Sequence, residues 1–171
     1  MATVNIAYGT YTALTVTSLD SLASSATAGW QSARIDNQTS VKALDYEITI
    51  KLDMANTAPA NDKAVYVYIS PAVTTDGGTT WLQADGGTTT LPGGTQGTYT
   101  IAGVTTTNNL DLLRALAYTT ADQVIQATMR LSDLYDSMPD GFQIIIVNYT
   151  GAAVAASGNI VAYRAITQTV A

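Results

Sequence analysis

The sequence predicts an all-β protein: an antiparallel β-sandwich, jelly-roll-like, with about eight or nine strands and long Gly/Thr-rich loops. Two segments carry this prediction. Across residues 43–54, apolar and polar residues alternate, which indicates a strand with one face in the core. Residues 142–147 are apolar or nearly so and lie between Gly141 and Gly151, a pattern typical of a short strand buried on both faces.

Composition is that of a single folded domain over residues 1–171, with 47% hydrophobic and 12% charged residues. The net charge of −6 argues against nucleic acid or an anionic membrane as partner. Because the chain has no Cys and no His, disulfides, thiolate or imidazole zinc sites and His-based catalysis are excluded. We see no signal peptide and no run of roughly 18 apolar residues, and therefore expect a soluble protein.

Five further segments have β-prone composition or alternation and are predicted to be strands: residues 6–16, 30–35, 64–70, 99–104 and 160–170. The first is expected near a sheet edge, with Gly9 as a bulge, and Pro71 is expected to end the third or place it at an edge. Residues 18–29 are expected to form a surface loop, although Leu19 and Leu22 also fit a helical turn.

Residues 109–137 fit two patterns. Leucines at 110, 113 and 116 have helical spacing, but alternation fits the same segment equally well. We predict two strands joined by a hairpin turn at residues 119–122, followed by a helical turn over residues 132–137.

Acidic residues suggest two candidate catalytic groups. Asp45 and Glu47 lie on the polar side of the alternating strand, where a solvated face with Lys51 nearby is the favoured interpretation. A second group, Asp133, Asp136 and Asp140 with Tyr135, could supply the two carboxylates of a glycoside hydrolase. Acids beside a turn more often cap or solvate it, so no residue is predicted to be catalytic.

The segment Thr74-Thr75-Asp76-Gly77-Gly78-Thr79-Thr80-Trp81 matches the Asp-box pattern of sialidase-like propellers. A propeller would require several repeats, whereas the pattern occurs once here, so we predict a stabilised hairpin in which the Asp accepts turn amides and the Trp packs beneath the loop. Asp76 with Asp85 lacks the dense oxygen ligands of a calcium loop. Residues 83–97 are expected to be a flexible loop rather than a phosphate cradle.

Several segments together resemble structural proteins of tailed phages, the jelly-roll cement or decoration proteins of the virion shell. The resemblance rests on Gly29-Trp30-Gln31-Ser32, the alternating segment 44–52, Val65-Tyr66-Val67-Tyr68 leading into the Asp-box segment, Pro139-Asp140-Gly141-Phe142 and Ile146-Val147-Asn148-Tyr149-Thr150-Gly151. The chain departs from the family at Phe142, where a Trp is expected, and in the longer loop 83–97.

This resemblance implies a non-enzymatic virion protein without catalytic, cofactor-binding or metal-binding residues. It would be made in the bacterial cytoplasm, bind the major capsid protein on the outside of the shell as a dimer or trimer, and brace neighbouring coat subunits. Contacts are expected from residues 6–16 and the loop tips. The alternative is a carbohydrate-binding or fibre/tail-associated module, in which Trp30, Trp81, Tyr66 or Tyr68 would stack on sugars, although these rings are more often packed.

Overall fold

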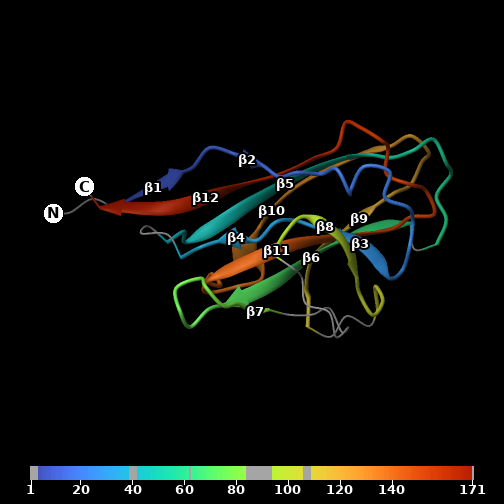
Figure 1. Ribbon diagram of the computed structural model, residues 1–171. Helices are drawn as coiled ribbons and strands as arrows, with labels where there is room; N and C mark the ends of the chain where they lie inside the picture. Colours follow the sequence, from blue (N-terminus) through green and yellow to red (C-terminus); the bar gives the residue numbers. More distant parts are fainter. Residues whose placement is uncertain (1–3, 39–41, 62, 84–93, 106–108, 171) are drawn as a thin grey trace.

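The computed structural model describes residues 4–38, 42–61, 63–83, 94–105 and 109–170, which form two antiparallel sheets packed face to face (Figure 1). Sheet A contains, in spatial order, β1 (Val4–Tyr8), β12 (Ile160–Val170), β5 (Asp45–Asp53) and β10 (Val124–Arg130), with β2 (Thr12–Ala13) also paired to β12. Sheet B contains β7 (Leu82–Gln83), β6 (Ala64–Val73), β11 (Gly141–Tyr149), β3 (Ala28–Gln31) and β8 (Gly97–Thr100), with β4 (Ile35–Asp36) on β11 and β9 (Asp111–Ala117) on β6.

The strand order confirms the jelly-roll sandwich. We set aside the three two-residue strands and β8, which is added to sheet B beside β3. Eight strands then remain in chain order: β1, β3, β5, β6, β9, β10, β11 and β12. Sheet A then holds the first, eighth, third and sixth of them, and sheet B the second, seventh, fourth and fifth, which is the jelly-roll arrangement. The predicted total of eight or nine strands was too low, because the described residues form twelve, three of them only two residues long.

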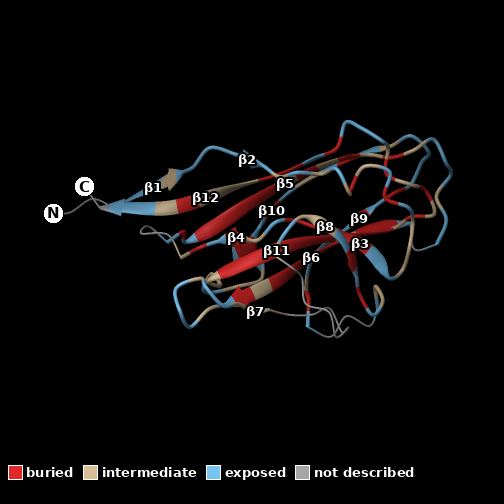
Figure 2. Ribbon diagram, in the orientation of Figure 1, coloured by how far each residue is buried: buried red, intermediate tan, exposed pale blue. Residues whose placement is uncertain are grey.

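Strand β11 is buried on both faces, as its sequence predicts, and every residue from Gly141 to Asn148 is buried (Figure 2). Alternate side chains enter different cores. Phe142, Ile144 and Ile146 pack between the two sheets. Ile145 and Val147 point to the other side of sheet B, where they form a second cluster with Tyr68, Tyr99, Ile101 and Leu110. A strand can be apolar at consecutive positions only when both of its faces are covered, and here the segment around β8 supplies the second cover.

Two observed strands have other bounds than predicted, for local reasons. Strand β6 continues through Pro71 to Val73. Its pairing with β9 ends at Ile69 and its pairing with β7 begins at Ala72, so Pro71 falls where that edge changes partner. The predicted strand 30–35 is divided into β3 and β4, which pair with different parts of β11.

The segment before β3, predicted to be a surface loop, is anchored by two leucines. The amides of Leu19 and Asp20 both donate to the carbonyl of Val16, which makes a single helical turn. The side chains of Leu19 and Leu22 belong to the core between the sheets. The loop prediction and the helical-turn alternative for residues 18–29 each describe part of this segment.

Residues 111–130 form the two predicted strands, β9 and β10, and not helices. The predicted hairpin is wrong, because β9 pairs with β6 in sheet B and β10 pairs with β5 in sheet A. The connection therefore crosses from one sheet to the other, with Asp122 at a positive φ of 61°. A 3-10 turn, η1 (Leu131–Asp133), follows β10 and places the predicted helical turn slightly earlier in the chain.

No helix in the described parts of the chain is long and apolar enough to span a membrane.

Candidate interaction surface

The face of sheet A that points away from sheet B, called here the outer face of sheet A, carries most of the exposed apolar side chains. Directly opposed residues of antiparallel strands share a face, and the register pairs Tyr8 with Ile166 and Arg164 with Glu47. Among the described residues, six of the ten exposed large hydrophobic side chains lie on this face: Val4, Ile6, Tyr8, Tyr11, Val124 and Ile160. Apolar side chains gathered on one face mark an interaction site more often than scattered ones do.

A cluster of five side chains, the Tyr–Arg cluster, occupies one end of this face: Tyr8, Tyr11, Glu47, Arg130 and Arg164. Arg164 donates from Nε to Oε1 of Glu47 at 2.8 Å, and its guanidinium lies 4.8 Å from the Tyr8 ring centre and 4.7 Å from that of Tyr11. The hydroxyl of Tyr11 donates to the same Oε1 at 2.5 Å. On the other side of Glu47, Arg130 lies 3.7 Å from Oε2 and donates to the Tyr8 hydroxyl at 3.2 Å.

The electrostatics of the cluster follow from this geometry. The hydrogen bond from Tyr11 and the hydrogen bond and charge of Arg164 lower the pKa of Glu47, although partial burial opposes them. The same hydrogen bond raises the pKa of Tyr11, because deprotonation would place a phenolate against a carboxylate. Glu47 therefore stays ionised at neutral pH and holds two arginines and a tyrosine in place.

The prediction that the polar side of β5 is solvated is wrong for two of its acidic residues. Asp45 and Glu47 are only 7% and 8% exposed. Asp45 accepts from the amide and hydroxyl of Ser132 at 3.0 and 2.8 Å, and so ties the 3-10 turn to β5. Long side chains from β10 and β12 cover Glu47, which is why it is shielded without lying in a core. Farther along β5, Lys51 and Asp53 pair at 3.3 Å, and both side chains are partly exposed.

The Asp-box segment forms the loop of the β6–β7 hairpin, as predicted. Oδ1 of Asp76 accepts the amides of Thr79 at 3.1 Å and Thr80 at 2.8 Å. The Nε1 of Trp81 donates to the Gly78 carbonyl at 2.9 Å. The indole also packs on Gly141 so closely that a Cβ added there would lie 2.7 Å from it. The motif therefore clamps the loop onto the start of β11 and shows no catalytic geometry.

Protonation of Asp76 is expected to loosen this hairpin. The amides of Thr80 and Thr79 and the hydroxyls of Thr80 and Thr74 hold the pKa of Asp76 at about 2. Since the folded pKa lies below the ordinary 3.8, the stabilisation is complete above that value and is lost as pH falls toward about 2. An NMR titration of the carboxyl carbon should report this low midpoint, and a midpoint near 3.8 would contradict it. In Asp76→Ala the amides of Thr79 and Thr80 should exchange faster, whereas exchange in Asp133→Ala should match the parent.

The acids proposed for hydrolysis do not converge. Asp133 and Asp136 are exposed, and the hydroxyl of Tyr135 donates to Asp111 instead. Asp140 accepts from the Thr74 amide at 3.1 Å and pairs with Lys42 at 3.6 Å. These contacts lower the pKa of Asp140, with the Thr74 hydrogen bond as the largest cause. Each of these carboxyl groups has a separate environment.

The rings considered for sugar stacking are mostly packed. Trp30 is fully buried between the sheets, and Trp81 is half-buried with the Arg34 guanidinium 4.7 Å from its ring centre. Tyr66 stacks on Tyr68 at 6.2 Å, and Tyr68 is 2% exposed. Tyr68 is therefore packed, as expected for these rings, whereas Tyr66 is only half-buried.

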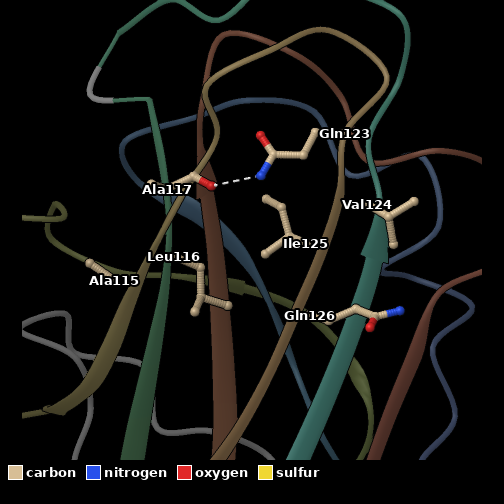
Figure 3. A pocket seen from close by; sticks show the side chains of 7 residues that line it. All are labelled: Ala115, Leu116, Ala117, Gln123, Val124, Ile125 and Gln126. Atoms are coloured by element: carbon tan, nitrogen blue, oxygen red, sulfur yellow. Dashed lines mark hydrogen bonds between the residues drawn. The ribbon is translucent and has the colours of Figure 1, made fainter.

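A groove of about 510 Å³ lies between the edge strands β9 and β10, where the two sheets meet without pairing. It is lined by apolar, small and amide side chains, and Gln123 bridges it by donating to the Ala117 carbonyl at 3.4 Å (Figure 3). Within the described ranges, no group of three or more acidic residues is placed to hold a metal ion. Asp85 and most of the predicted loop 83–97 fall outside those ranges.

Sequence reasoning did not single out four members of the Tyr–Arg cluster. One signal was present: Arg130 and Arg164 are two of only seven basic residues, and each lies at the polar position of an alternating segment. The sequence does not show that β10 and β12 flank β5, and it is this arrangement that brings both guanidinium groups to Glu47.

Comparisons with family models, with curated proteins and with solved structures found no match to this chain.

Proposed function

We propose that the protein is a structural component of a virion that binds the outside of a phage capsid and braces neighbouring coat subunits. The observation that carries the proposal is the outer face of sheet A, where exposed apolar side chains adjoin the Tyr–Arg cluster. Tyrosine and arginine dominate the energetic centres of protein interfaces, and a rigid sheet presents them at little entropic cost. The identity of the partner as a capsid shell comes from the sequence resemblance.

The fold supports a binding role in a second way. The two arginines are held by Glu47, so their guanidinium planes and the adjoining rings are already oriented before a partner arrives. Pre-organisation of this kind reduces the entropy lost on association. Many copies on one shell would turn modest single contacts into durable attachment.

The direct test uses shells of the virus that encodes the protein, purified without it. Added protein is expected to co-sediment with the shells and to raise their thermal disruption temperature. Shells that neither bind the protein nor gain stability would overturn the proposal. Binding to a glycan array without binding to shells would instead favour the carbohydrate-binding alternative.

Tyr8→Ala is expected to weaken shell binding by about 30-fold, the effect of losing roughly 2 kcal/mol at an interface hot spot. The Tyr8 ring is 51% exposed, so the free energy of unfolding should change little. Leu82→Ala is the matched control, since Leu82 is 63% exposed but belongs to sheet B. Equal shell affinities of the two variants, measured by quantitative co-sedimentation, would contradict the assignment of the outer face of sheet A.

A further inference from the structure

Strand β1 is an unprotected sheet edge. It pairs with β12 on one side, and among the described residues no strand pairs with its other side. Its sequence, Val4-Asn5-Ile6-Ala7-Tyr8, has no charge and no proline, the usual devices that keep an edge from pairing with another chain. It lies at the end of the molecule where Val4 pairs with Val170, and four of its five residues are exposed.

The direction of its free hydrogen-bonding groups follows from the ladder. The Gly9 amide donates to the Ala165 carbonyl, so at position 9 the backbone groups face β12. Backbone groups alternate in direction along a strand, so those of Asn5 and Ala7 also face β12. The amides and carbonyls of Val4, Ile6 and Tyr8 therefore face the open edge.

These three residues are self-complementary about Ile6. If a second β1 lies antiparallel with Ile6 opposite its own copy, then Val4 falls opposite Tyr8 of the other chain and Tyr8 opposite Val4. All three positions are then hydrogen-bonded pairs, each exchanging two backbone bonds. The side chains at these positions are 54%, 56% and 51% exposed, and they would meet across the junction on one face.

We propose that the occupant of this edge is a second copy of the chain, joined through antiparallel β1–β1 pairing about a two-fold axis at Ile6. A two-fold axis requires a surface that complements itself, and this strand does. The charge distribution favours the same occupant. The chain has a net charge of −6, but β1 and the residues paired with it, Thr167, Gln168 and Thr169, are uncharged. Two copies can therefore approach at this edge without bringing like charges together.

The resulting dimer is weak in isolation. One five-residue strand buries much less than the roughly 800 Å² per partner of a standard stable interface. Its consequence is geometric: the two sheets A join into one, and the two Tyr–Arg clusters lie on a single continuous face. This inference does not rest on the capsid assignment, because it concerns the purified protein alone.

The first experiment is sedimentation velocity over a concentration series extending to about 1 mM, the range in which weak pairs form. The parent protein is expected to show a reversible monomer–dimer equilibrium. A protein that stays monomeric throughout overturns the proposal. Ile6→Pro removes an amide that faces the open edge and not β12, so it should abolish the dimer and leave the thermal unfolding of the monomer nearly unchanged. A dimer that survives in a folded Ile6→Pro protein also overturns it.

The second experiment tests the two-fold register and does not depend on the proline variant. Ile6→Lys and Ile6→Glu place like charges directly opposite each other in the dimer, so each variant alone should be monomeric. Mixed together they should associate, because opposite charges then meet at the axis. The same two substitutions at Ile160, which is 49% exposed on the outer face of sheet A but away from β1, should leave the parent dimer intact. Failure of the mixture to associate, or loss of the dimer in the Ile160 variants, refutes edge pairing at Ile6.

Discussion

Ile146→Ala is expected to lower the free energy of unfolding by about 3–5 kcal/mol. Ile146 is fully buried on β11, and its side chain packs in the core between the two sheets. The backbone of β11 is held along nine residues by β6 and, at Ile146 itself, by Trp30 of β3 on the other side, so the surrounding structure cannot collapse onto the lost atoms. The remaining cavity adds to the lost transfer free energy.

The variant Ile145→Ala tests the smaller apolar cluster separately from the core between the sheets. Ile145 is equally buried, but it packs in the smaller cluster on the other side of sheet B. A loop segment supplies much of that cover and can relax inward, so we expect a smaller loss, about 2–3 kcal/mol. Urea denaturation measures both values, and exposed Ile160→Ala, within about 0.5 kcal/mol of the parent, is the control. A neutral Ile145→Ala would show that the second cluster does not form.

Glu47→Gln is expected to destabilise the protein by about 1–3 kcal/mol at neutral pH. The substitution keeps the shape of the side chain and an acceptor for Tyr11. It removes the negative charge that binds both arginines, so the two guanidinium groups then lie on either side of an uncharged side chain. Asp133→Asn, an exposed acid on the 3-10 turn, should change stability by less than about 0.5 kcal/mol and serves as the control.

The difference in unfolding free energy between the parent protein and Glu47→Gln should depend on pH in a definite direction. The folded pKa of Glu47 lies below the ordinary value of 4.5, so the ionised form stabilises the fold fully above that pH. As pH falls through the folded pKa, the parent protein loses the contribution and approaches the variant. The difference in unfolding free energy should therefore be constant from neutral pH to about 4.5 and shrink below it. A difference that is unchanged under strongly acidic conditions would mean that packing, and not the charge, is responsible.

Local patterns in the sequence were sufficient for much of the fold. The alternation that ends at Met54 and the apolar run from Phe142 to Val147 both form strands as predicted, and their apolar side chains are buried. The Asp-box hairpin is equally local, because Asp76 and Trp81 complete their hydrogen bonds within the same loop. In this hairpin the interacting groups lie within a few residues of one another.

The tertiary structure alone decided which strands are neighbours. Residues 119–122 have the composition of a hairpin turn, yet they connect two sheets, because β9 and β10 find their partners in β6 and β5. Glu47 is shielded for the same kind of reason, since its arginines come from strands that are distant in the chain. Periodicity reports how one strand divides its own faces between core and surface. It does not contain the pairing that brings Arg130 and Arg164 together, because that pairing depends on the free energy of the whole assembled sheet.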